Sequence, residues 1–383
     1  MIIGVLKETA ANEHRVAVVP AHLPSLTKAG ASIVVQAGAG IAAGYPDQQY
    51  QDKGAEIAAD AAAVAAKADV LLMVQSGAAR ADLVDSVKQG QVLVGMMDPY
   101  QPNDVFSSFV SKGVTTLSME LMPRITRAQS MDVLSSMANL AGYKAALLAA
   151  DNLPKMFPMM MTAAGTITPA KVFVIGVGVA GLQAIATTKR LGAVVSAYDI
   201  RPAVKDQVLS LGAKFVEMEL DSDTAEDSGG YAREMDEEFY RKQRELMKSV
   251  IAESDVVITT AAIPGKQSPV LVTTEMVEAM APGSVIVDLA VERGGNVEPS
   301  KPGETVNHNG VSIIGPVNIA STLSYNASQL YSKNITTYLL SLIDKESKQL
   351  TLNMEDEIVQ ATVVTHQGVA PNERTREWLG LQA

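Results

Sequence analysis

The sequence predicts an α/β protein of two domains, each built on a mainly parallel sheet, with a cleft between the domains. Two observations support this prediction. Short apolar segments alternate with helical stretches along both halves of the chain, and a glycine-rich turn joins a strand to a helix in the second half. The length of 383 residues, with 47% hydrophobic content, is enough for about two domains with separate cores.

The first third of the chain reads as one α/β unit. Five short apolar segments are expected to be strands: residues 2–6, 32–36, 69–74, 91–94 and 114–117. Helical stretches separate them, as in a sheet of parallel strands. No phosphate-binding fingerprint accompanies them, because Ala37-Gly38-Ala39-Gly40 is not followed by an amphipathic helix. We interpret that glycine-rich segment as a loop.

A long helix is predicted to connect the two halves. The helical pattern runs from Gln129 to Asp151 and ends before Pro154. A later helical stretch, Ser324 to Asp344, is expected to return to the first half. We therefore predict an N-terminal domain of residues 1–134 plus 324–383 and a second domain of residues 135–323.

A glycine-rich turn near the middle of the chain predicts a dinucleotide site. From Lys171 to Arg201 the chain reads as a strand, a turn with Gly176, Gly178 and Gly181, a helix and a second strand. The first glycine permits a tight turn, the second lets the backbone approach a pyrophosphate, and the third lets the helix pack on the strand. We predict a Rossmann-like domain; the alternative is a tight turn without a ligand.

An acid follows the second strand, about 20 residues past the last glycine, as this fingerprint requires. It is Asp199, whose carboxylate is suited to accept hydrogen bonds from an adenosine ribose and to repel a 2′-phosphate. NAD is therefore favoured over NADP. Arg201, two residues later, is the counter-indication, because an arginine there also suits a 2′-phosphate.

The segment of about residues 220–248 is longer than an ordinary connection between a strand and a helix. Gly229-Gly230 offers a hinge, and Tyr231 and Met235 are apolar groups in a polar stretch. We interpret the segment as a mobile loop over the cofactor. A solvated, charged surface excursion is the alternative.

Composition limits the classes of function. There is no cysteine, and the four histidines are scattered, so we expect neither thiolate chemistry nor a metal site. A net charge of −11 argues against nucleic acid as a partner, and charges interrupt every apolar run before it could span a membrane. We expect a cytoplasmic chain without direct membrane insertion. The methionines at positions 156 and 159–161 are interpreted as core filling between domains rather than a contact surface.

Several motifs together resemble the NAD(H)-binding domain I of proton-translocating transhydrogenase. They are MELMPRITRAQSMDVLSSMANLAGYKA, FPMMMTAAGT, VIGVGVAGLQAIATTKRLGA, GGYAREM, VITTAAIPGK and VIVDLAVERGGN. The resemblance covers nearly the whole chain, in the variant whose α subunit is split. It implies a Re/Si-specific NAD(P) transhydrogenase component that exchanges hydride between NADH and NADP⁺. The NADP(H) would lie on a domain of the β subunit, and membrane-spanning subunits would couple the exchange to proton translocation. It also implies a homodimer at the cytoplasmic face of the inner membrane.

The resemblance also implies site residues. Those near the nicotinamide and its ribose are Arg124, Ile125, Thr126, Arg127, Gln129, Asp132 and Ser135. Those around the pyrophosphate and adenosine ribose, beside the three glycines, are Val179, Asp199, Ile200 and Arg201. Gly230, Tyr231 and Gln243 match the family's mobile loop, and Ala262 follows a strand at the sheet edge where such ligands bind. Gln129 and Asp132 would orient the nicotinamide without acid or base chemistry. Helix capping is the alternative role of Gln129, Asp132 and Ser135.

Alanine dehydrogenase shares this architecture and is the rival interpretation. Its N-terminal segment is matched by Lys7, Glu8, Glu13, Arg15, Val16 and Ala17. That enzyme needs a lysine and a histidine near the substrate carbonyl, because its reaction moves a proton as well as a hydride. At those places this chain has Gln75 and Met97-Asp98-Pro99, and the family's acid becomes Glu292. Arg15, which holds a substrate carboxylate in that family, is expected to serve structure here. A regulatory NAD-binding module is a third interpretation.

Overall fold

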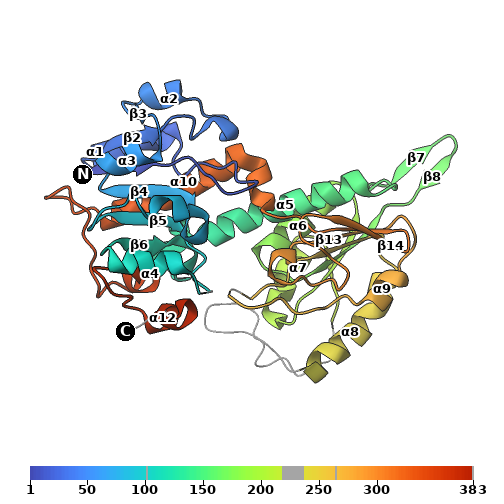
Figure 1. The fold of residues 1–383 in the computed structure, drawn as a ribbon. Helices are drawn as coiled ribbons and strands as arrows, with labels where there is room; N and C mark the ends of the chain where they lie inside the picture. The colour runs from blue at the N-terminus through green and yellow to red at the C-terminus, as the bar shows by residue number, and fades with distance from the viewer. Residues whose placement is uncertain (101, 218–236, 264, 382–383) are drawn as a thin grey trace. The chain divides into compact units, whose positions relative to one another are not determined.

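The computed structural model describes residues 1–100, 102–217, 237–263 and 265–381, and Figure 1 shows its ribbon. The chain divides into two compact units. The first unit is Met1–Met137 together with Ala320–Ala383, and the second unit is Ala138–Ile319. The end of the sequence thus belongs to the same unit as its beginning.

The first unit contains a seven-stranded sheet in the order β16-β6-β5-β4-β1-β2-β3. The strands are β1 (Ile2–Val5), β2 (Ser32–Gln36), β3 (Glu56–Ala58), β4 (Val70–Gln75), β5 (Val92–Met96), β6 (Thr115–Ser118) and β16 (Val363–Thr365). All neighbours pair in parallel except β16, which runs antiparallel to β6. Five of these strands match the predicted segments. The two edge strands, β3 and β16, have three residues each and were not predicted.

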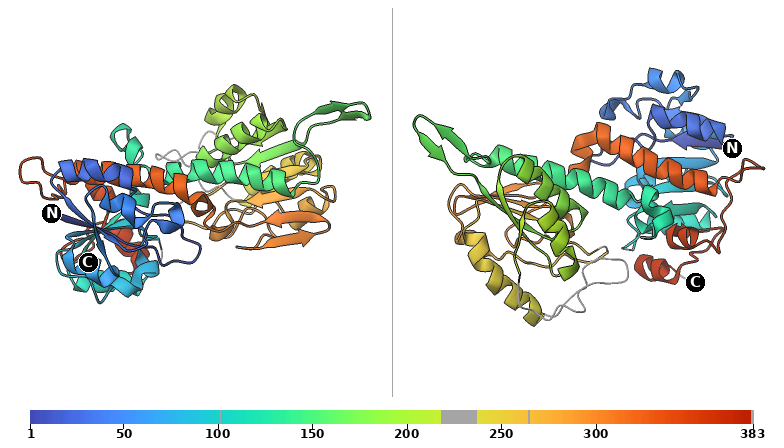
Figure 2. Two further views of the ribbon diagram at one scale, coloured as in Figure 1. Left: turned by 90° about the horizontal axis from the view of Figure 1, so that it is seen from above. Right: turned by 180° about the vertical axis from the view of Figure 1, so that it is seen from behind.

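Seven α-helices belong wholly to the described part of this unit. They are α1 (Leu23–Lys28), α2 (Asp47–Gln51), α3 (Ala61–Lys67), α4 (Asp104–Ser111), α10 (Ser324–Leu342), α11 (Glu357–Thr362) and α12 (Glu373–Leu379). The long helix α10 lies beside α1 (Figure 2). Its Tyr331 is fully buried and donates its hydroxyl to the carbonyl oxygen of Met73 on β4 at 2.9 Å. Helix α10, from the C-terminal part of the chain, is therefore anchored to the sheet of the N-terminal part.

The second unit contains another seven-stranded sheet, in the order β11-β10-β9-β12-β13-β15-β14. The strands are β9 (Lys171–Ile175), β10 (Val194–Tyr198), β11 (Lys214–Phe215), β12 (Val256–Thr259), β13 (Val285–Asp288), β14 (Thr305–His308) and β15 (Val311–Ile314). Only β14 pairs antiparallel. The predicted α/β class with two mainly parallel sheets is confirmed.

Helices α6 (Val179–Arg190), α7 (Lys205–Ser210), α8 (Glu237–Ala252) and α9 (Thr274–Glu278) belong to the second unit. The long helix α5 (Val133–Asn152) covers most of the predicted connecting helix but begins four residues later than Gln129, because residues 126–131 form the separate turn η5. Gly142 on α5 lies so close to α6 that a Cβ atom there would come within 2.0 Å of the carbonyl oxygen of Ala180. Only a glycine allows this approach of the two helices, which fixes the beginning of α6.

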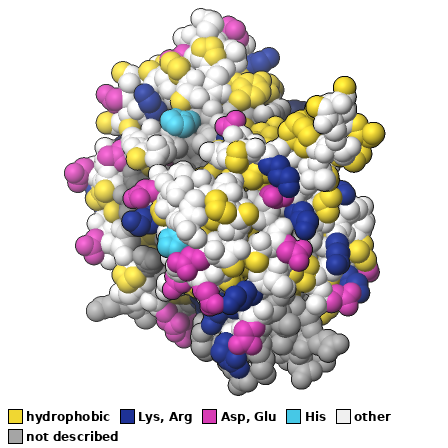
Figure 3. Space-filling view, turned by 90° about the vertical axis from the view of Figure 1, so that its right-hand side faces the viewer, with side chains coloured by type: hydrophobic (Ala, Val, Ile, Leu, Met, Phe, Trp, Pro, Cys, Tyr) yellow, Lys and Arg dark blue, Asp and Glu magenta, His cyan; other side chains and the backbone are white. Residues whose placement is uncertain are grey.

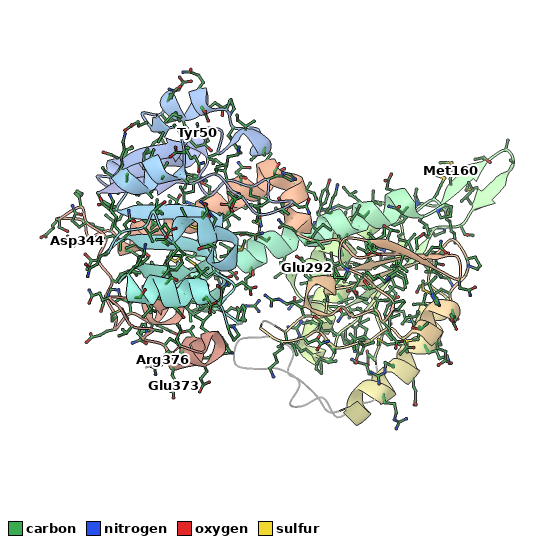
Figure 4. All side chains as sticks on the ribbon, viewed as in Figure 1. Tyr50, Met160, Glu292, Asp344, Glu373 and Arg376 are labelled. Atoms are coloured by element: carbon green, nitrogen blue, oxygen red, sulfur yellow. The ribbon has the colours of Figure 1, made fainter. Side chains whose placement is uncertain are left out.

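A small hairpin of β7 (Met160–Thr162) and β8 (Gly165–Ile167) forms a separate two-stranded sheet in the second unit. All six of its strand residues are exposed. Met159 and Met161 are 60% and 76% exposed, so the interpretation of these methionines as core filling is wrong. The segment forms an exposed hairpin instead, and neither face of its short two-stranded sheet is covered. Met160 is labelled in Figure 4, and exposed hydrophobic side chains appear in the view from this side (Figure 3).

Candidate functional site

The glycine-rich turn joins β9 to α6. Gly176, directly after β9, has a φ of 91°, a left-handed conformation that favours glycine. Gly178 is the N-cap of α6 in an extended conformation, and Val179 is the first residue of the helix. The backbone N–H groups at the start of this 12-residue helix have no carbonyl partner within the helix and carry the positive end of its dipole. The turn is therefore suited to a pyrophosphate.

The second and third glycines are needed for different reasons. A Cβ atom on Gly181 would lie 2.0 Å from the carbonyl oxygen of Gly176, so only glycine permits this packing of helix on turn. A Cβ atom on Gly178 would meet no atom of the described residues within 4 Å. The space beside Gly178 is thus not needed for the protein's own packing. A cofactor phosphate that approaches the backbone there fits this open space.

Asp199 lies one residue beyond β10 and next to this turn. Its Oδ2 accepts a hydrogen bond from the N–H of Val177 at 2.7 Å. Arg201 donates to the same carboxylate through its backbone N–H, Nε and Nη2, each at 2.9 Å. The side chains of Asp199 and Arg201 are only 5% and 12% exposed. The acid is therefore held at the glycine-rich turn by two neighbouring segments.

The segment after β12 supports the turn from the other side. The hydroxyl of Thr260 donates to the carbonyl oxygen of Gly176 at 2.9 Å. The side chain of Asn296 accepts from the N–H of Ala261 at 3.0 Å and donates to the carbonyl oxygens of Ala261 and Pro269. Ala262, the predicted contact on this segment, is exposed immediately after Ala261. Asn296 thus fixes both ends of the loop that carries Ala262.

Asn296 is in turn held by a buried acid at the end of β13. Asp288 is fully buried and accepts from the N–H of Asn296, the N–H of Ala290 and the hydroxyl of Thr259. Sequence reasoning missed Thr260, Asp288 and Asn296 as parts of the site. An acid directly after a buried strand was the available signal for Asp288, because the carboxyl ends of parallel strands share one edge of the sheet.

Gln243 lies on α8 and is 1% exposed. Its Nε2 donates to the hydroxyl of Tyr198, the residue before Asp199, at 2.8 Å. Among the described residues none donates to its buried Oε1. Since a buried acceptor without a donor costs free energy, this atom is suited to a donor from a ligand. Ile200 is half-buried against the core, and the predicted contacts Gly230 and Tyr231 lie outside the described residues, as does most of the predicted mobile loop.

The residues predicted near the nicotinamide lie within residues 124–135 of the first unit, just before η5 (Thr126–Met131), on it, and at the start of α5. Asp132 caps α5: its carboxylate accepts from the N–H and the hydroxyl of Ser135 at 2.9 and 2.6 Å. Arg127 donates to both carboxylate oxygens of Asp356 at 2.8 Å, which lowers the pKa of Asp356. The side chains of Arg124, Thr126 and Gln129 are exposed, and Ile125 is half-buried.

A buried polar cluster occupies the carboxyl edge of the sheet in the first unit. Arg15 donates its Nε to Oε1 of Glu13 at 2.7 Å, and both residues are buried. Gln75 donates to Oε2 of Glu13 at 2.8 Å. Glu13 therefore neutralises Arg15, the arginine expected from the sequence to serve structure. Arg15 takes part in the internal structure of this chain.

Two further carboxyls, those of the half-buried residues Glu8 and Glu120, belong to the same edge of this sheet. Glu8 accepts from the N–H groups of Val74 and Gln75 at the end of β4, and Glu120 accepts from those of Met97 and Asp98 after β5. Burial raises the pKa of Glu8 to about 7 and also raises the pKa of Glu120. Met97 is itself buried. Glu292, the substituted acid, is exposed on η7 (Val291–Arg293) in the second unit (Figure 4).

Family models cover almost the whole chain. The model described as "Alanine dehydrogenase/PNT, N-terminal domain" matches residues 4–141, and "Alanine dehydrogenase/PNT, C-terminal domain" matches residues 145–373. The chain belongs to the alanine dehydrogenase/PNT family. The two domain models together match both halves of the chain.

Within the alanine dehydrogenase/PNT family, the chain is more similar to transhydrogenases. The relative from Rhodospirillum rubrum, the first portion of its NAD(P) transhydrogenase subunit alpha, is 48% identical over 372 residues, which are 96% of this chain and 97% of that protein. The crystal structure of transhydrogenase from Sinorhizobium meliloti is 49% identical, has a TM-score of 0.87 and matches 97% of this chain and 100% of that one. Alanine dehydrogenase of Mycobacterium tuberculosis is 27% identical over 389 residues, 100% of this chain and 97% of that protein. The predicted resemblance to transhydrogenase is confirmed.

The described residues contain neither a helix that could span a membrane nor a cluster that could hold a metal ion. None of the described helices combines the length and the apolar composition that crossing a membrane requires. In the described part of the chain, no three side chains of histidine, aspartate or glutamate are grouped so that they could hold a metal ion.

Proposed function

We propose that this chain is the NAD(H)-binding component of a Re/Si-specific, proton-translocating NAD(P) transhydrogenase. It exchanges hydride between its own NADH and NADP⁺ on a partner domain. The observation that carries the proposal is the arrangement at the carboxyl edge of the second sheet. There, open space beside Gly178, the start of α6 and Asp199 combine the features that a dinucleotide needs. Relatives named as transhydrogenase subunits support the same conclusion.

The chemistry of direct hydride exchange explains which groups the chain lacks. A bound nicotinamide supplies or accepts the hydride at C4, and no heteroatom of the acceptor needs a proton. The protein has only to bind, orient and exclude water. By the resemblance, Gln75 and Met97-Asp98-Pro99 correspond to the places of the lysine and histidine of an amino-acid dehydrogenase; in this structure Gln75 is bonded to Glu13 and Met97 is buried. These residues favour transhydrogenation over amino-acid oxidation.

We assign the ends of the cofactor to separate groups of residues. Gly176, Gly178, Val179 and Gly181 hold the pyrophosphate, Asp199, Ile200 and Arg201 surround the adenosine ribose, and Gln243 and Ala262 complete this part. Gln129 and Asp132 orient the nicotinamide, with Arg124, Ile125, Thr126, Arg127 and Ser135 beside them. Asp132 already caps α5 through Ser135. One carboxylate thus orders the helix start and keeps acceptor sites for a ribose or a carboxamide.

The partners follow from the proposed reaction. The NADP(H)-binding domain of the β subunit accepts the hydride, and membrane-spanning subunits hold the chain at the cytoplasmic face of the inner membrane. We also propose a homodimer in which the exposed hairpin β7–β8 contacts a second copy. Its methionines and Ile167, which is 39% exposed, present an apolar and adaptable surface that water disfavours.

A reconstituted assay tests the proposed function. The purified chain is mixed with the NADP(H)-loaded domain of the β subunit, and reduction of an NAD analogue by NADPH is followed by absorbance. Pyruvate, ammonium and NADH without the partner domain provide the control. Partner-dependent reduction with an inactive control supports transhydrogenation. Turnover in the control supports an alanine-dehydrogenase-like enzyme, and NADH binding without activity in either assay supports a regulatory module.

A further inference from the structure

The carboxylate of Asp199 is fully engaged by protein donors. Oδ1 accepts from the N–H and Nε of Arg201, and Oδ2 accepts from Nη2 of Arg201 and the N–H of Val177. A carboxylate offers about four acceptor sites, so these four bonds use its capacity. Three of the four come from Arg201. Charge-assisted, two-pronged pairs of this kind are among the stronger hydrogen-bonded contacts in proteins.

We propose that Arg201 is a latent binding group for the 2′-phosphate of NADP(H), and that Asp199 suppresses it by holding its guanidinium. On this view the ion pair, rather than the repulsion of phosphate by the acid alone, decides which dinucleotide the site accepts. The inference deepens the proposed function, on which it rests, because it assigns the specificity of the same site to one pair of residues.

Geometry places Arg201 within reach of the ribose. In this type of fold the acid after the second strand lies beside the 2′-hydroxyl of the adenosine ribose. The Nε and Nη2 atoms of Arg201 lie 2.9 Å from that same acid. The guanidinium is therefore about one hydrogen bond from the position of the 2′-oxygen. Its planar fork also matches the geometry of a phosphate.

Burial makes the pair sensitive to the loss of one partner. The side chain of Arg201 is 12% exposed and that of Asp199 is 5% exposed. If the acid loses its charge, a nearly buried guanidinium loses the negative charge of Asp199, which is unfavourable. A 2′-phosphate brings a replacement anion to the same place. Removing the negative charge of Asp199 should therefore strengthen the binding of NADPH relative to that of NADH.

The reaction gives a reason for such a device. Hydride exchange between two pools requires that this site hold NAD(H) while the partner domain holds NADP(H). If both sites accepted NADP(H), hydride would pass between identical couples with no net transfer. An arginine that is masked in the native chain keeps the two sites distinct.

A double-mutant cycle tests the inference. Binding of NADH and NADPH, and of 5′-AMP and adenosine 2′,5′-bisphosphate as probes without a nicotinamide, is measured by calorimetry. The proteins are the native chain, Asp199→Asn, Arg201→Gln and the double variant. Asparagine keeps an acceptor for the N–H of Val177 but loses the charge that holds Arg201. Asp206→Asn, an exposed carboxyl on α7, removes the same charge nearby and is the matched control.

We expect Asp199→Asn to bind NADPH and the bisphosphate about tenfold or more tightly than the native chain does, since a charged hydrogen-bonded contact is gained. The gain should vanish in the double variant and be absent in Asp206→Asn. The inference is overturned if the Asp199→Asn variant is natively folded by circular dichroism and binds 5′-AMP, but binds NADPH and the bisphosphate no more tightly than the native chain does. It is also overturned if the tighter binding persists in the double variant, which lacks Arg201. Asp199→Ser provides a second test with the same two outcomes if asparagine perturbs the fold. Binding of NADH by the native chain and its partner-dependent turnover report on the proposed function separately.

Discussion

The hydroxyl of Thr260 donates a hydrogen bond of 2.9 Å to the carbonyl oxygen of Gly176. This bond ties the end of β12 to the first glycine of the turn, two residues before the N-cap of α6. Gly176 also lies so close to this segment that a Cβ atom there would come within 2.9 Å of the Ala261 nitrogen. The dinucleotide turn is therefore shaped by a segment far along the chain as well as by its own glycines.

Replacing Thr260 by valine should loosen this turn. The substitution keeps the shape of the side chain but leaves the carbonyl oxygen of Gly176 without this donor, which costs about 1 kcal/mol of unfolding free energy. If this free energy is lost from the turn conformation that binds NADH, the affinity for NADH falls by up to about fivefold. Denaturant unfolding and calorimetric titration of NADH measure the two effects. Thr260→Ser, which keeps the hydroxyl, is the control, and equal behaviour of the two variants would contradict the assigned role.

The second and third glycines should respond in opposite ways to alanine. Gly178→Ala is expected to keep native stability within about 0.5 kcal/mol, because its methyl group meets no atom of the described residues. It should nevertheless weaken NADH binding at least about tenfold, because the methyl group lies where the pyrophosphate must approach. Gly181→Ala should destabilise the fold itself by about 3 kcal/mol or more, since its methyl group would press on the Gly176 carbonyl. Thermal unfolding with and without NADH separates the two. Normal NADH affinity in a stable Gly178→Ala variant would exclude a phosphate at this place.

Glu8 predicts a specific dependence of stability on pH. Burial raises its pKa from 4.5 to about 7, so the folded chain binds more protons than the unfolded chain between these values. The contribution of this protonated carboxyl to the free energy of unfolding is fully present below pH 4.5 and is lost as the pH rises through 7. At about 1.36 kcal/mol per unit, the loss amounts to at most about 3 kcal/mol.

The variant Glu8→Gln isolates this effect, because its amide does not titrate. Unfolding free energies of both proteins are measured in urea between about pH 4.5 and 8. We expect the native chain to lose stability relative to Glu8→Gln by about 3 kcal/mol across this range. Glu120 is present in both proteins, so its titration cancels in the difference. Parallel curves would mean that Glu8 is ionised in the fold throughout.

Local signals in the sequence were sufficient for the main strands and for the glycine-rich turn. Alternation of short apolar segments and helical stretches marks the central strands, because strands buried on both faces read as apolar runs. The edge strands β3 and β16 escaped because each has only three residues and their pairing depends on a neighbour far along the chain. The methionine segment was misread because composition alone does not distinguish an outward hairpin from a core.

Long-range contacts within the site were the least predictable part. The acid Asp199 follows from its spacing to the glycines, but its two bonds from the guanidinium of Arg201 require knowledge of where that side chain points. Asn296 lies far beyond the turn in the sequence, and only the fold brings its amide to Ala261. Such contacts depend on strand order, which a single sequence does not state.

The exposed hairpin yields a prediction about the oligomer. Aspartate at both Met159 and Met161 should abolish the proposed dimer, because two charges would have to be buried in an apolar contact. Sedimentation velocity should show a dimer for the native chain and a monomer for the double variant, with unchanged circular dichroism. Leu209→Asp on α7 is the matched control, since this leucine is also exposed, at 49%, but lies outside the hairpin. It should remain a dimer. A double variant that still sediments as a dimer would place the interface on another surface, and a monomeric native chain would contradict the homodimer itself.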